Sequence, residues 1–63
     1  MRVTAETITE EQICELELVG AISHATMCNA VGFRARPDRY LRFGAVALSR
    51  CAEAWNARSG GGR

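Results

Sequence analysis

The residues of this chain best suited to chemistry are arginines interleaved with aromatic side chains. Arginine beside an aromatic ring clamps phosphates and stacks on nucleic-acid bases, and the same mixture is typical of hot spots in protein interfaces. Arg50 lies about two helical turns beyond this cluster and extends it. We therefore expect a partner-binding surface made of Arg34, Arg36, Arg39, Arg42, Phe43 and Arg50.

Acidic residues near the start of the chain form the counterpart of this cluster. Residues 1–33 hold one base and five acids, a net charge of −4, whereas residues 34–63 hold seven bases and two acids, a net charge of +5. Either the two halves neutralise each other through surface ion pairs, each worth ~0–1 kcal/mol, or one end faces a charged partner. Glu10, Glu11 and Glu15 are the acidic candidates for such a contact.

The cysteines and the single histidine raise the question of a metal site. His24 and Cys28 are four residues apart and share a helical face, and with Cys14 and Cys51 they offer the four N/S ligands that zinc takes. Their spacing matches no zinc ribbon or finger, and free cysteine behaves as a small buried hydrophobe. We expect structural cysteines, with no metal and no cofactor; a metal-stapled domain is the alternative.

No residue pattern predicts catalysis. Nucleophilic catalysis needs a base beside the nucleophile and a third group to orient it, and the one histidine falls in a predicted apolar stripe. The glycines at 60–62 lack the lysine and helix of a phosphate loop. A chain of 63 residues is also too small to enclose a dry pocket. The sequence predicts a protein that is not an enzyme.

Three predicted helices position these side chains. Residues 9–12 (TEEQ) match a capping box that opens the first helix, and Gly20 ends it. A second helix of about two turns runs from a cap at Ser23 to Gly32. Asp38 caps a third helix that continues for about twenty residues.

These elements predict an all-α fold, a small three-helix bundle with a long C-terminal helix. Residues 8–58 form the single helical domain, between a flexible N-terminus at 1–7 and a disordered tail at 59–63. Gly44 either weakens the third helix or marks a close approach of two helices. The expected core comprises Ile8, Ile13, Leu16, Val19, Ile22, Met27, Cys28, Val31, Leu41, Ala45, Leu48, Ala52 and Trp55.

Length and composition limit the classes of protein to which this chain can belong. With 63 residues and 48% hydrophobic content, the chain is globular in composition but marginal in size, which favours a partner or a homo-oligomer. No apolar run approaches a membrane span, and the start lacks the apolar core of a signal peptide. Three cysteines cannot pair completely. We expect a reduced, cytoplasmic protein with no membrane contact.

Three segments resemble short, largely uncharacterised proteins of proteobacterial phages and mobile elements. The segment ITEEQI at 8–13 is similar to their ITDEQI start, GAISHATMC at 20–28 continues the match, and RCAEAWNAR at 50–58 resembles their end. The resemblance covers most of residues 8–58, is weakest at 33–43 and carries no catalytic residues. Such small phage proteins often bind host machinery, and anti-CRISPR inhibitors are similar in size and makeup.

The resemblance and the charge pattern lead to one expected function and one alternative. We expect a non-enzymatic interaction protein of phage type that binds and blocks a bacterial protein complex, with a CRISPR effector as one such target. The alternative is a small arginine-rich module that binds nucleic acid.

Overall fold

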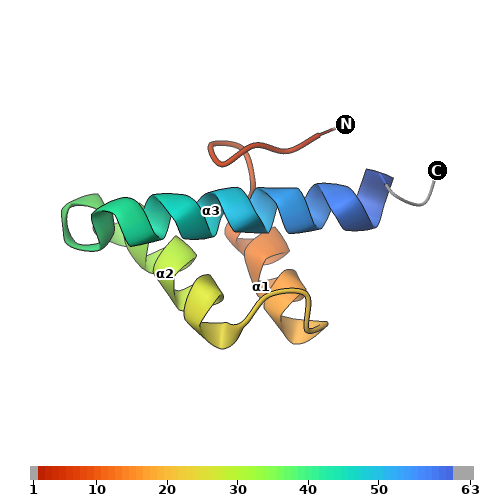
Figure 1. Cartoon of the computed structure of the whole chain (residues 1–63), viewed down its shortest axis with the longest axis horizontal. Helices are drawn as coiled ribbons and strands as arrows, with labels where there is room; N and C mark the ends of the chain where they lie inside the picture. The colour runs from red at the N-terminus through yellow and green to blue at the C-terminus, as the bar shows by residue number, and fades with distance from the viewer. Residues whose placement is uncertain (1, 61–63) are drawn as a thin grey trace.

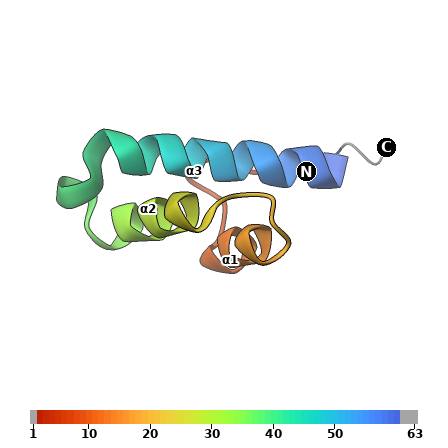
Figure 2. The same cartoon turned by 60° about the horizontal axis from the view of Figure 1, so that its bottom comes forward.

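The computed structural model describes residues 2–60, the last two by their backbone alone. It consists of three helices, α1 (Glu10–Leu18), α2 (His24–Ala35) and α3 (Pro37–Gly60), and the described residues form no strand. Helices α1 and α2 lie on one side of α3, while the segment before α1 crosses α3 (Figures 1 and 2). The prediction of an all-α fold with a long C-terminal helix is confirmed.

The start of α1 is set by local contacts. The Thr9 hydroxyl accepts from the Gln12 amide at 3.1 Å, and the Gln12 side chain accepts from the Thr9 amide at 2.8 Å. Ile8 and Ile13, on either side of the cap, are both buried and form the hydrophobic staple. The chain leaves the helix through Gly20, whose φ of +80° is open to glycine without strain.

Helix α2 starts where predicted but runs further. Ser23 is its cap and accepts from the Thr26 amide at 3.1 Å. The helix then continues through Gly32 to Ala35, so the prediction that Gly32 ends it was wrong. Gly32 lies inside the helix because the Tyr40 ring packs onto its Cα; a Cβ there would come within 2.8 Å of the ring.

Helix α3 opens with a single turn that is offset from the rest. Pro37 is its first residue, a position that suits the fixed φ of proline. Asp38 is therefore inside the first turn, and the prediction that it caps the helix was wrong. The turn ends at Leu41, which has φ 41° and ψ −122°. The long part of the helix follows Leu41.

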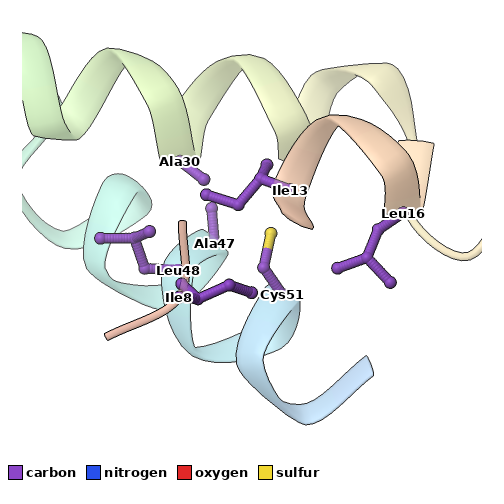
Figure 3. Packing of buried hydrophobic residues seen from close by; sticks show 7 residues of the cluster. All are labelled: Ile8, Ile13, Leu16, Ala30, Ala47, Leu48 and Cys51. Carbon is purple, nitrogen blue, oxygen red and sulfur yellow. The ribbon is translucent and has the colours of Figure 1, made fainter. Parts of the chain in front are cut away.

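The core lies where the three helices and Ile8, which precedes the α1 cap, meet (Figure 3). The α3 face that it uses contains Leu48 and Ala52, as predicted, and also Gly44, Ala47 and Cys51, which the predicted stripe left out. Four predicted core residues are exposed instead: Val19, Cys28, Leu41 and Ala45. The buried hydrophobic residues are Ile8, Ile13, Leu16, Ala30, Ala47, Leu48, Cys51 and Ala52.

Gly44 sets which face of α3 is buried. A Cβ on Gly44 would collide with the Cβ of Phe33 and lie 2.5 Å from its Cγ, so the absent side chain lets Phe33 of α2 rest on the α3 backbone. Of the two interpretations of Gly44 from the sequence, the close approach is the one observed. Helix α3 is turned so that Gly44 faces α2, and this buries Ala47 and Cys51 below it.

The segment before α1, predicted to be flexible, makes specific contacts with the helices. The Val3 amide donates to Asn56 Oδ1 and the Asn56 side-chain amide donates to the Val3 carbonyl, both at 2.9 Å. The predicted tail at 59–63 is described only for Ser59 and Gly60, whose backbone continues α3; residues 61–63 lie outside the described residues.

Candidate partner-binding surface

The outward face of α3 presents an aromatic residue, an aliphatic residue and two arginines. Phe43 is 74% exposed and Val46 is 47% exposed. They lie three residues apart, and Arg42 and Arg50 lie four residues before and four residues after Val46, on the same face. Because Gly44 and Ala47 take the buried positions, the helical period turns these four side chains toward solvent.

This face borders a groove along the seam between α2 and α3. An open hollow of about 340 Å³ beside Phe43 is lined by Thr26 and Asn29 of α2 and by Arg42, Phe43, Val46, Ala47 and Arg50 of α3. A second open hollow of about 550 Å³ continues past Arg50 and Thr26 toward Ala54. The two hollows share Thr26 and Arg50, so together they follow the seam. We call Arg42, Phe43, Val46 and Arg50 the α3 face.

The sequence predicted three of these four residues and missed Val46, together with Thr26 and Asn29. Val46 is three residues after Phe43 and four before Arg50, so a helical wheel groups it with them. The predicted stripe did not place Ala47 in the core, and it is the burial of Gly44 and Ala47 that leaves Val46 on the exposed side. Thr26 and Asn29 belong to the groove only through the packing of α2 on α3, which has no local sequence signal.

The remaining arginines of the predicted surface do not all join this face. Arg36 and Arg39 are exposed at the junction of α2 and α3. Arg34 is partly buried, and its Nη2 donates to the carbonyl of Ala5 at 2.9 Å. Arg34 therefore fastens the segment before α1 to α2, and its guanidinium is engaged within the fold.

The acidic candidates lie on α1. Glu10 and Glu11 are exposed in its first turn, and Glu15 is exposed and pairs with Arg58 at 3.7 Å. Across the described residues, the other contact within 4.0 Å between a carboxylate and a basic side chain joins Glu17 to His24, 3.6 Å apart. The interpretation that the acids of α1 neutralise the clustered arginines is thus not what the structure shows. Arg36, Arg39 and the arginines of the α3 face keep their charge toward solvent.

The cysteines occupy three different environments. Cys51 is fully buried in the core, and burial raises the pKa of its thiol above the ordinary value, while the nearby Arg34 charge acts in the lowering direction. Cys14 and Cys28 are exposed on α1 and α2. Over residues 2–60, no three or more His, Cys, Asp or Glu side chains gather closely enough to hold a metal ion. The four residues of the metal alternative are not brought together.

Comparisons with known proteins add no family to this description. A scan against protein-family models, a search of curated proteins and a search of solved structures each found no match to the chain. In the part of the chain that the structure describes, no helix combines the length and the apolar character that crossing a membrane requires.

Proposed function

We propose that this chain is a non-enzymatic interaction protein that binds another protein through the α3 face. The observation that carries the proposal is the exposed ring of Phe43, 74% accessible and set in a groove between Arg42 and Arg50. Arginine and aromatic side chains are over-represented at interface hot spots, where they fill pockets on the partner. A chain this small also gains most from a partner, because its own core is thin.

The chemistry of the face indicates the chemistry of the partner. Arg42 and Arg50 have no carboxylate within 4.0 Å among the described residues, and Glu53 follows Arg50 by three residues on α3. A complementary surface would carry carboxylates around an apolar pocket that accepts Phe43. The resemblance to phage proteins supports a bacterial protein complex as the partner that this chain occludes; a CRISPR effector is one such complex.

Occlusion needs no turnover. The hollows along the seam are open to solvent, whereas catalysis of a covalent step profits from a site that excludes water. The proposed action is steric and electrostatic: the bound chain covers a surface that the partner complex uses.

Site-specific photocross-linking tests the proposal. A benzophenone amino acid replaces Phe43 in one bait and Ala25, exposed on α2, in the matched control. In a bacterial lysate, the bait labelled at position 43 should give a discrete protein adduct that the control does not. Excess unlabelled wild type should suppress the adduct, whereas a Phe43→Ala/Arg50→Glu competitor should require about 30-fold more protein, the loss expected for a hot spot of about 2 kcal/mol.

A second competitor separates the two charged surfaces. A Glu10→Lys/Glu11→Lys/Glu15→Lys variant should compete as well as wild type if the α3 face makes the contact. If it competes poorly and the α3 variant competes fully, the acidic end of α1 is the binding surface. If both variants compete as well as wild type, the proposal is wrong.

Nucleic-acid binding is a second candidate function, favoured by Arg36, Arg39 and Arg42, which are exposed and have no carboxylate within 4.0 Å in the described part of the chain. Three phosphate contacts predict an affinity that falls with salt at a log–log slope of about −2 to −3. Fluorescence anisotropy with a labelled single strand and a labelled duplex, between about 50 and 200 mM salt, measures this slope. Absence of binding at the lower salt concentration removes this candidate.

A further inference from the structure

A second group of reactive side chains lies on the face of α2 that points away from the α3 face. The Sγ of Cys28 is 3.4 Å from Nε2 of His24. The other ring nitrogen of the same histidine, Nδ1, is 3.6 Å from a carboxylate oxygen of Glu17. Thiol, imidazole and carboxylate thus lie in a row, and the exposed His24 and Cys28 leave the thiol accessible. This row is independent of the proposed function.

Local structure holds the row together. Ser23 caps α2 so that His24 is its first helical residue, and Cys28 follows one turn later on the same face. Glu17 belongs to the end of α1, and the turn through Gly20, with φ +80°, folds the start of α2 back beside it. The His24–Cys28 contact therefore depends on the start of α2 at Ser23, and the His24–Glu17 contact depends on the turn at Gly20 that follows α1.

The order of the three groups matters for their chemistry. An imidazole that faces a carboxylate through Nδ1 keeps Nε2 available to accept a proton, and the carboxylate stabilises the imidazolium that results. The thiol lies beside Nε2 and the carboxylate lies beside Nδ1, on the opposite side of the ring. A single metal ion bound to one ring nitrogen would therefore reach only one of these two groups. The arrangement favours activation of the thiol over metal binding.

We propose that Cys28 is a thiol-modification site that exchanges with small-molecule disulfides of the glutathione type, with His24 as its base and Glu17 positioning His24. In the exchange, the Cys28 proton moves to Nε2 and the thiolate sulfur attacks one sulfur of the disulfide. The S–S bond breaks as the new S–S bond to Cys28 forms. The departing thiolate takes up a proton, so the products are a mixed disulfide and one free thiol.

The other two cysteines are internal references in the same molecule. Cys14 is exposed like Cys28, but the chain's one histidine is engaged with Cys28 and Glu17. Cys51 is fully buried and out of reach of a reagent in the folded state. Reaction rates at the three positions therefore compare an accessible thiol that has a base, an accessible thiol without one and an inaccessible thiol.

The test measures mixed-disulfide formation on the intact protein by peptide mass spectrometry. The probe is hydroxyethyl disulfide, which is uncharged, so the acids around Cys14 do not repel it. At about pH 7, Cys28 should react about threefold to tenfold faster than Cys14, the range expected for one exposed charge-assisted hydrogen bond to the thiolate. Glutathione disulfide, used in parallel, shows whether a charged physiological disulfide reacts at the same position.

Two variants distinguish activation from simple accessibility. His24→Gln and Glu17→Gln should lower the Cys28 rate and leave the Cys14 rate unchanged, with the larger loss for His24→Gln. The matched control, Ala25→Gln, adds the same side chain at the neighbouring exposed position and should leave both rates unchanged. Circular dichroism of each variant checks that α2 remains folded.

A pH series measures how the ratio of the Cys28 and Cys14 rates changes with pH. A difference in accessibility alone would leave this ratio constant. Above about pH 10 thiols are ionised with or without a base, so the ratio of the Cys28 and Cys14 rates should fall toward the ratio seen in His24→Gln. Equal rates at Cys28 and Cys14 near neutral pH would overturn the proposal. So would a faster Cys28 whose rate His24→Gln does not change, or a rate ratio that is constant with pH.

Discussion

Replacing Gly44 by alanine should destabilise the protein, although the same exchange in an isolated helix is stabilising. Helix propensity alone favours alanine over glycine in a helix interior by about 1 kcal/mol. In this fold, however, the new Cβ would collide with the Cβ of Phe33 and approach its Cγ to 2.5 Å and its Cδ1 to 2.6 Å. The two effects oppose each other, and their difference is measurable.

The obstructing atom decides which effect is larger. The Cβ of Phe33 is attached to the α2 backbone and does not move when the side chain rotates, so relief requires α2 and α3 to separate. Overpacking of this kind costs about 1–3 kcal/mol, and a rigid obstruction justifies the upper end. After subtraction of the propensity gain, the net loss is about 2 kcal/mol, which lowers the melting temperature of so small a domain by roughly 8–16 °C.

Gly32 provides the matched control because it is also inside a helix and also in contact with an aromatic residue. At this position the new Cβ would collide with Cζ of Tyr40 and lie 2.8 Å from Cε1 and Cε2, but these atoms are at the far end of the side chain and the ring can swing away. Gly32→Ala should therefore leave the free energy of unfolding within about 1 kcal/mol of wild type.

The assay is thermal and urea unfolding followed by circular dichroism at constant protein concentration. We expect Gly44→Ala to melt well below wild type and Gly32→Ala to melt close to it. If Gly44→Ala melts at or above the wild-type temperature, helix propensity dominates, and Phe33 does not rest on Gly44 as described. Equal destabilisation by both substitutions would refute the distinction between a fixed Cβ and a movable ring.

Four other substitutions test separate contacts. Thr9→Ala removes the cap of α1 and should lower the free energy of unfolding by about 1 kcal/mol in urea; an unchanged value would contradict the observed capping box. Leu41→Gly relieves a φ of 41° at a side chain that is 64% exposed, so it should raise the melting temperature, by the equivalent of about 1 kcal/mol; a lower temperature would mean that Leu41 is not strained. Asn56→Ala removes both hydrogen bonds to Val3 and should speed hydrogen exchange at the Val3 amide, as measured by NMR; an unchanged rate would show that these bonds do not protect it. Burial raises the pKa of Cys51 above its ordinary 9.0, so the folded chain holds this proton more tightly than the unfolded chain. The stability that this tighter proton binding contributes is complete below about pH 9 and is lost as the pH rises through the raised pKa. Melting temperatures between about pH 8 and 10 should therefore fall more steeply for wild type than for Cys51→Ala. Parallel curves of melting temperature against pH would contradict the burial effect.

The sequence predicted those parts of the fold that neighbouring residues determine. The start of α1 depends on side chains three residues apart, and the start of α2 on Ser23 and Thr26, so both were found from the sequence. The end of α2 was missed because the ring of Tyr40 covers Gly32 from a later part of the chain. A glycine near the end of an apolar stripe looks the same whether it terminates a helix or provides space for a neighbour.

In the candidate site, too, features set by neighbouring residues were predicted and features set by distant contacts were not. Phe43 and Arg50 were identified from composition and spacing, and the structure places them on one face. Arg34 has the same residue type and the same neighbours in sequence, yet it is engaged with the carbonyl of Ala5, which is 29 residues away. Which arginines of a cluster remain available depends on such long-range hydrogen bonds, and no local pattern reveals them.

The two proposed sites can be tested separately because they use different sides of α2. Thr26 and Asn29 line the groove next to the α3 face, whereas His24 and Cys28 are turned away from it by roughly half a helical turn. A mixed disulfide on Cys28 should therefore leave cross-linking through position 43 unchanged, and variants of the α3 face should leave the Cys28 rate unchanged. Coupling between the two measurements would require a change in the packing of α2 on α3. The Gly44→Ala variant, which strains that packing directly, is the protein in which such coupling would first be seen.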